Sequence, residues 1–178
     1  QAQQEIGIRR FLEEGGYNAF TTNFEDLYGM KQLPGLAVQR LMAEGYGVAG
    51  EGDGKTAAID RLLKIMARGK DIGFMEDYTY ELASGQEAIL ESHMMEVDPT
   101  LAATKPRIVV SPLSMGDRED PARLVFDGKA GEGVVVSMAD FGTHYKLLIN
   151  EVEAFEPTTE APNLPVARVL WKTKPNFH

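Results

Sequence analysis

The sequence predicts an α/β segment followed by antiparallel β structure: a partial Rossmann-like α/β unit in residues 1–71, and a β-rich sheet or small barrel in residues 72–178. Up to about Asp71, apolar residues recur at helical spacing and alternate with short runs of aromatic and β-branched residues. Beyond Asp71 the helical periodicity largely disappears, and turn signals separate short strand-like runs. We therefore expect two units of different architecture.

The first unit is expected to begin with a helix and a strand. Ile8, Phe11 and Leu12 lie at helical spacing before two glycines, and residues 17–22 have strand-forming side chains. A second helix is expected from Pro34, which suits the first turn of a helix, to Gly45, which suits a left-handed stop.

A buried strand over residues 46–50 and a third helix complete this βα-type succession. Asp53 is a suitable N-cap for that helix. Its apolar stripe is expected to consist of Ile59, Leu62, Leu63 and Met66.

The second unit is expected to consist of strands. The strand-like runs are 72–82, 88–97, 107–110, 124–126, 134–138, 144–152 and a short last run around Trp171. Turn signals at 84–85, 127–128, 131–133 and 141–142 divide them at spacings typical of an antiparallel sheet or small barrel.

Composition narrows the class of partner. A formal net charge of -9 disfavours nucleic acid and anionic membrane surfaces, because an acidic protein gains no counterion release at phosphates. The absence of cysteine leaves carboxylate, imidazole and water as metal ligands and is compatible with a cytoplasmic location. No apolar stretch has the roughly 20 residues needed to span a bilayer, and residues 1–5 do not resemble a signal peptide. Since the first residue is not Met, a processed, trimmed or excised chain is expected.

Glu51, Glu76 and His93 are the candidate functional residues, because each lies at or beside a strand-like run. Glu51 follows a strand and precedes a helix, where open α/β sheets gather ligands. Glu76 and His93 lie in largely apolar runs, where a polar group is costly unless it is paired or metal-bound. Two carboxylates and an imidazole could hold a divalent metal, and the carboxylates could also transfer protons.

Other interpretations of these residues remain open. The segment 50–56 resembles a phosphate-binding loop, but Ala49 stands where the Walker pattern needs glycine. Glu76 could instead pair with Lys70, and Asp77 could lie on a solvated strand face. Base rates favour the core for Phe24 and Met94, although either could face a ligand. His144 is expected to be structural or exposed, and His178 to be mobile at the terminus.

The run over residues 23–42 resembles bacterial L-arabinose isomerase. Further similar segments follow in the same order at residues 45–53, 74–80, 92–97, 120–124 and 164–167. The resemblance covers nearly the whole chain. It implies that residues 1–71 are the end of a central α/β domain and that residues 72–178 are a β-rich C-terminal domain.

This resemblance implies a metal-dependent aldose–ketose isomerase that converts L-arabinose to L-ribulose through an enediol; conversion of D-galactose to D-tagatose stays open. Glu51, Glu76 and His93 would hold Mn2+, with Co2+ or Mg2+ as alternatives, and the two glutamates would be the acid/base pair. Phe24, Met94 and Met115 would line the sugar pocket. Homo-oligomeric association is also expected, since an incomplete α/β half leaves apolar surface to be covered.

The chain departs from the family at two points. Family members have an N-terminal domain that has no counterpart here, and their fourth ligand, a histidine in a Gly-Gly-His-His segment, is also without one. Water, another carboxylate or His178 would have to complete the metal shell. A catalytically inactive fragment that acts as a metal-binding or assembly module is therefore the alternative to an active enzyme.

Overall fold

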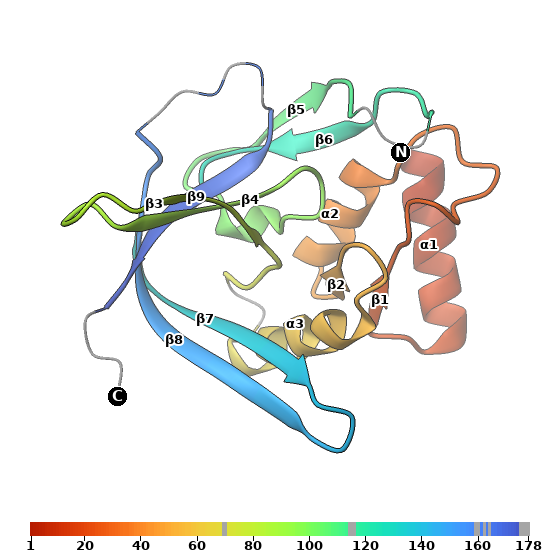
Figure 1. Cartoon of the computed structure of the whole chain (residues 1–178). Coiled ribbons are helices and arrows are strands. Elements are labelled where there is room, and N and C mark those ends of the chain that lie inside the picture. The colour runs from red at the N-terminus through yellow and green to blue at the C-terminus, as the bar shows by residue number, and fades with distance from the viewer. Residues whose placement is uncertain (69–70, 114–116, 159–160, 162, 164, 175–178) are drawn as a thin grey trace.

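The structure of the chain is a computed structural model, which describes residues 1–68, 71–113, 117–158, 161, 163 and 165–174. Figure 1 shows the helices on one side of the molecule and the long strands curving around the other. In chain order the elements are α1 (Ala2–Gly15), β1 (Ala19–Thr21), α2 (Gly35–Ala43), β2 (Gly47–Ala49), α3 (Gly54–Met66), β3 (Glu76–Glu81), β4 (Ala88–His93), the 3-10 turn η1 (Pro99–Leu101), β5 (Arg107–Val110), β6 (Ala122–Val125), β7 (Gly131–Asp140), β8 (Tyr145–Phe155) and β9 (Ala167–Thr173).

The three helices begin and end close to the expected residues. Gly16 caps α1 in the left-handed conformation with φ of 66°, and Pro34 occupies the N-cap of α2. The side chain of Asp53 accepts a hydrogen bond from the amide of Thr56 at the start of α3, as its N-cap role requires. The end of α1 at the two glycines and the Asp53 N-cap are confirmed, whereas Pro34 lies one residue before the first turn in which it was expected.

The predicted apolar stripe of α3 is wrong in part. Its buried residues are Ala57, Asp60 and Lys64, whereas Leu62 and Met66 are exposed. The reason is a buried ionic cluster: the ammonium of Lys64 contacts Asp98, and its Nζ donates to the carbonyl of Met42 at 2.9 Å. The inner face of α3 therefore carries charge that is neutralised by residues distant in sequence.

Strands β1 and β2 pair in parallel, with Phe20 opposite Val48. Val48 packs with Val38 and Met42 of α2 in a buried cluster. Because β1 and β2 point the same way, their carboxyl ends lie together at one edge, directly before the turn that carries Glu51. The packing of α2 and α3 thus fixes the position of that turn.

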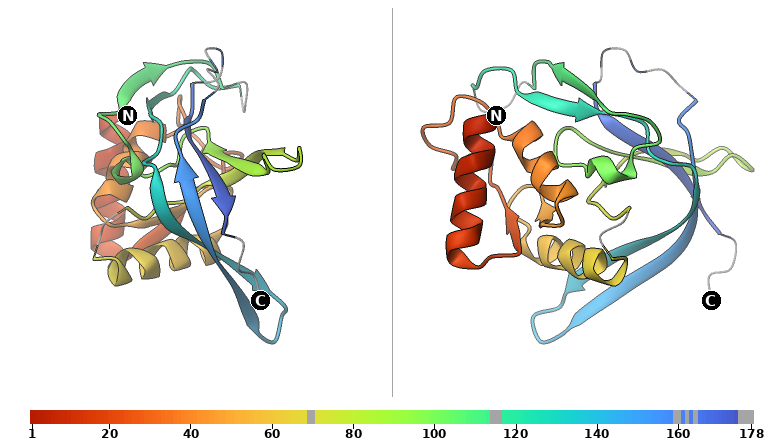
Figure 2. Two further views of the ribbon diagram at one scale, coloured as in Figure 1. Left: turned by 90° about the vertical axis from the view of Figure 1, so that its left-hand side faces the viewer. Right: turned by 180° about the vertical axis from the view of Figure 1, so that it is seen from behind.

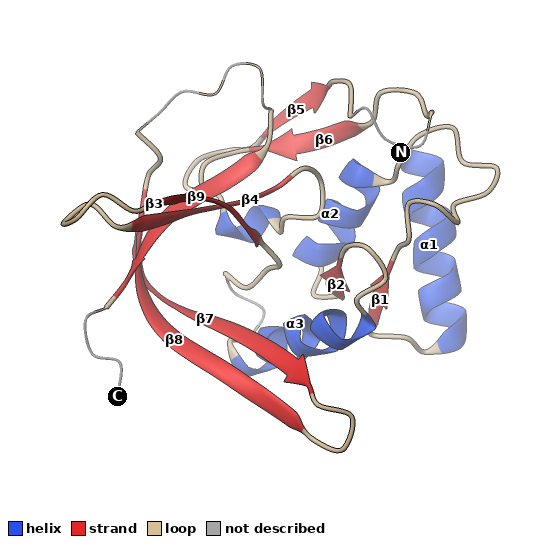
Figure 3. Ribbon diagram, viewed as in Figure 1, coloured by secondary structure: helices blue, strands red, loops and turns tan. Residues whose placement is uncertain are grey.

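The longer strands form a five-stranded antiparallel sheet in the order β3-β4-β9-β8-β7, and β5 pairs with β6 in a separate ribbon (Figure 3). An α/β fold with a mostly antiparallel sheet agrees with the predicted class. The Rossmann-like and small-barrel details, like the boundary at residue 71, stay predictions. Figure 2 shows the β7–β8 hairpin extending as an arm past α3.

Gln39 connects the helical side to the strands. It is fully buried; its Nε2 donates to the carbonyls of Val97 and Leu124 at 3.1 Å each, and its Oε1 accepts from the amide of Leu124 at 2.7 Å. Val97 also packs with Phe126 and Ala167 in a second core cluster. A buried amide with three satisfied bonds holds α2 in one register against the segment that follows β4.

Candidate active site

Glu51 projects from a tight turn at the carboxyl ends of β1 and β2. Its φ of 61° is unusual for a residue with a side chain, and Gly52 continues the turn with φ of 84°. Thr21 on β1 holds the turn, because its hydroxyl donates to the carbonyl of Gly50 at 3.3 Å and accepts from the amide of Gly52 at 3.0 Å. The left-handed backbone at Glu51 sets the direction in which its side chain leaves the turn.

The antiparallel register of β3 and β4 places Glu76 beside His93. Glu76 begins β3 opposite Ser92, and His93 is the next residue and the last of β4. The Nε2 of His93 lies 3.6 Å from an oxygen of Glu76. The pairing of these two strands therefore assembles two of the three predicted residues.

His93 is held in a largely buried position. Its side chain is 13% exposed, its Nδ1 lies 2.9 Å from a carboxylate oxygen of Glu96, and its ring meets the ring of Phe74 edge-on. Burial lowers the pKa of His93, but hydrogen bonding to Glu96 and the charges of Glu96, Glu76 and Glu51 outweigh this effect, so the pKa is raised. The imidazole is thus surrounded by three carboxylates.

Glu76 departs from the expectation that it lies in an apolar setting. Its side chain is 49% exposed, and all of β3 is exposed, because β3 is an edge strand of the sheet. Partial burial still raises the pKa of Glu76; the His93 charge opposes this effect, and the charges of Glu51 and Glu96 add to it. The carboxyl therefore combines solvent access with a strengthened affinity for protons.

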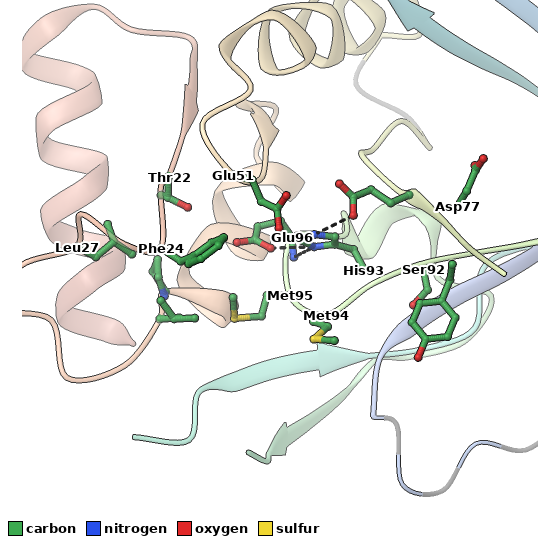
Figure 4. A pocket seen from close by; sticks show the side chains of 14 residues that line it. Thr22, Phe24, Leu27, Glu51, Asp77, Ser92, His93, Met94, Met95 and Glu96 are labelled. Carbon is green, nitrogen blue, oxygen red and sulfur yellow. Dashed lines mark hydrogen bonds and ion pairs between the residues drawn. The ribbon is translucent and has the colours of Figure 1, made fainter. Parts of the chain in front are cut away.

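A pocket of about 190 Å³ brings the predicted residues together. Figure 4 shows Glu51 pointing toward the region of His93 and Glu96, with Phe24 and Met94 along the same cavity. This volume is below the roughly 300–1,000 Å³ of drug-sized ligand sites, so the pocket suits a small metabolite. The polar lining also includes Thr22, Asp77, Tyr78 and Ser92.

The donor types fit a hard or borderline divalent cation, since two carboxylates and an imidazole are ligands that Mn2+ accepts. With the side chains placed as they are, no group of three or more acidic or histidine residues in the described part of the chain converges closely enough to hold a metal ion. Glu51 and Glu76 both reach solvent and have long side chains. Metal binding therefore requires these side chains to come closer together than they lie here.

The remaining predicted residues lie elsewhere. Met115, His178 and Lys70 lie outside the described residues. His144 is exposed and stacks on Phe141 with ring centroids 5.3 Å apart, as expected for a residue with a structural or surface role. Lys55, the lysine of the phosphate-loop-like segment, lies 3.3 Å from Asp53, which it neutralises.

Glu96 is a site residue that the sequence argument missed. It is 5% exposed and lies between Met95 and Val97, both buried. A polar group inside an apolar run was the signal used for Glu76 and His93, and the same signal applied to Glu96 would have singled it out.

Comparisons with known proteins match the two parts of the chain separately. The model of the L-arabinose isomerase central domain matches residues 1–69, and that of the L-arabinose isomerase C-terminal domain matches residues 71–178. Proteins named L-arabinose isomerase 2 from Bacillus licheniformis and L-arabinose isomerase from Oceanobacillus iheyensis are 81% and 80% identical over 177 residues. L-arabinose isomerase 1 of Clostridium acetobutylicum is 71% identical.

These matches cover 99% of the chain but only 36–37% of each relative. The chain thus spans little more than a third of the length of the curated proteins it matches. Among the described helices, none is long and apolar enough to cross a membrane.

Proposed function

Since the chain belongs to the L-arabinose isomerase family, we propose that its pocket is the centre of a metal-dependent aldose–ketose isomerase that converts L-arabinose to L-ribulose. The observation that carries this proposal is that Glu51, Glu76 and His93, from three separate chain segments, line the same small cavity. D-Galactose, which would give D-tagatose, is a second substrate to be tested.

Isomerisation needs one group to move a proton between C2 and C1 and another to handle the hydroxyl proton. We assign the carbon-bound proton to Glu76, whose carboxylate lies 3.6 Å from His93 Nε2 and reaches solvent. Glu51 enters the cavity from the turn after β2 and can exchange the hydroxyl proton. The reacting form of the substrate is the open-chain sugar. In this proposal both carboxylates contact the enediol that forms from it.

We assign the metal to Glu51, Glu76 and the Nε2 of His93, with Mn2+ as the first choice and Co2+ or Mg2+ as alternatives. When bound, a divalent cation there supplies positive charge beside the substrate oxygens. Phe24 and Met94 form an apolar part of the cavity wall. A low-dielectric wall strengthens the electrostatic interactions of the nearby carboxylates.

A catalytically inactive metal-binding or assembly module is the second candidate. It is favoured by the absence of three converged acidic or histidine groups in the described part of the chain.

Self-association is part of the proposal. The β7–β8 arm exposes consecutive apolar side chains at Leu147, Leu148 and Ile149, each 55–60% exposed. An apolar arm of this kind is costly to leave in water, and a second copy of the chain would cover it. Light scattering that shows a monomer at micromolar concentration would reject this part.

The test compares the chain alone with a chimera in which it replaces the 177 matched residues of the B. licheniformis relative. L-Ribulose is measured with Mn2+ for each protein and for its Glu51→Gln variant, with the exposed Glu87→Gln as matched control. We expect Mn2+-dependent product that Glu51→Gln abolishes and Glu87→Gln retains. If the chimera forms L-ribulose and the chain alone does not, the chain by itself is the catalytically inactive module. Equal rates of L-ribulose formation for Glu51→Gln and wild type reject the proposed site.

A further inference from the structure

The His93 ring is fixed on three sides. Its Nδ1 lies 2.9 Å from Glu96 Oε2, and its ring packs edge-on against Phe74 with centroids 5.1 Å apart and an interplanar angle of 68°. Gly50 lies beside the third side of the ring, and a Cβ placed there would be 3.4 Å from Cε1 and 3.6 Å from Nε2. Only one edge of the ring, that of Nε2, faces Glu76.

The buried Oε2 oxygen of Glu96 has one neighbour that can act as its partner. Glu96 is 5% exposed, and its buried Oε2 has no described hydrogen-bond partner apart from the nearby His93 Nδ1. An unsatisfied buried carboxylate oxygen costs several kcal/mol. The contact with His93 is therefore the interaction that makes burial of Glu96 tolerable.

The same contact determines which ring nitrogen carries the proton. A carboxylate oxygen at 2.9 Å attracts Nδ1 only if a proton lies between them. The amide of Glu96 also lies 3.4 Å from Nδ1, but accepting from it would leave an unprotonated nitrogen facing the carboxylate, which is repulsive. We infer that the shorter contact, to the charged oxygen, is the stronger of the two, which makes Nδ1 the donor to Glu96.

We propose that Glu96 is a positioning residue that holds His93 as the Nδ1–H tautomer, so that Nε2 presents its lone pair to a divalent cation shared with Glu51 and Glu76. The cation rests on the proposed function, whereas the tautomer follows from the contacts of this chain alone. A histidine ligand whose other nitrogen donates to a carboxylate is oriented and made more basic.

The test reads the tautomer directly in the metal-free chain. Nitrogen shifts of ¹⁵N-labelled histidine are recorded above the pH at which His93 titrates. With three histidines in the chain, a His144→Gln sample helps to assign them. Glu96→Met removes the acceptor at similar length, Glu96→Gln keeps its shape, and the exposed Glu87→Met is the control. Circular dichroism checks that each variant folds.

We expect unprotonated Nε2 in the wild type and the control, and protonated Nε2 in Glu96→Met, with an intermediate population in Glu96→Gln. Mn2+ affinity, measured by calorimetry, should fall roughly 10–100-fold in Glu96→Met. If Glu96→Met does not fold, Glu96→Gln alone carries the test.

A wild-type His93 with protonated Nε2, or an unchanged tautomer in a folded Glu96 variant, overturns the inference even if the chimera is active. The expected tautomer change in a protein that neither binds Mn2+ nor turns over L-arabinose supports the positioning role and rejects the proposed function.

Discussion

Replacement of Lys64 by methionine removes the only ammonium among the described residues that contacts the buried Asp98. Lys64, Asp60 and Asp98 are 3%, 4% and 1% exposed, and Lys64 Nζ also lies 3.9 Å from Asp60. Loss of one partner from a buried ion pair costs about 3–5 kcal/mol, because the other charge stays buried without compensation. If the free energy of unfolding falls by about 2 kcal/mol per molar urea, the urea concentration at the unfolding midpoint should fall by roughly 1.5–2.5 M at neutral pH.

The loss should depend on pH. Burial raises the pKa of Asp60 to about 6, while the Lys64 charge opposes this effect. A raised folded-state pKa means that stability is full below the unfolded pKa and is lost as pH rises through the folded value. Without Lys64 the folded pKa rises further, so the deficit of Lys64→Met relative to wild type should grow between about pH 5 and pH 7.

Urea unfolding at pH 5, 6 and 7 measures both effects. Lys129→Met is the matched control, because Lys129 pairs with Asp71 at the surface, where the two side chains are 49% and 55% exposed. Such a pair contributes about 0–1 kcal/mol. A Lys64→Met loss no larger than that of the control, or a loss equal at all three pH values, would refute this account of the buried cluster.

Two further predictions concern stability. Burial and the Asp77 carboxylate raise the pKa of Glu91 to about 9. Wild type should therefore lose stability relative to Glu91→Gln as pH rises from about 5 to 9, by at most about 1.4 kcal/mol per pH unit. A difference in urea unfolding between the two proteins that does not change with pH contradicts this prediction. A Cβ at Gly47 would lie 2.3 Å from the carbonyl oxygen of Ala57, so Gly47→Ala should lower the free energy of unfolding by about 1–3 kcal/mol or more. A Cβ at Gly54 would have no atom within 4 Å, so Gly54→Ala, the control, should not lower it. Equal urea midpoints for the two variants would contradict this and show that α3 can move.

The local elements could be predicted because their signals are local. Gly16, Pro34 and Asp53 act through their own backbone preferences or through residues a few positions away, and the structure places them at the ends of helices as expected. The candidate site followed from the same logic, since Glu51 and His93 lie where strands end.

The sequence could not show which residues far apart along the chain contact each other in the fold. Lys64 looks like a surface residue until Asp98, 34 residues later, is found against it. Glu76 lies in a largely apolar run, where a polar group was expected to be costly unless paired or metal-bound, but β3 is an exposed edge strand, and strand order is not encoded in any one strand. Glu96, by contrast, lies only three residues from His93, and its position inside an apolar run could have identified it.

Isomerisation of L-arabinose by the Mn2+-loaded chimera in D2O, followed by NMR, tests the central claim most directly. The account predicts L-ribulose that carries deuterium at C1, formed at least about 100-fold more slowly by Glu76→Gln because the carbon-bound proton passes through that carboxylate. L-Ribulose formed by Glu76→Gln at the wild-type rate, or product that retains all of its C2 hydrogen at C1, would contradict it.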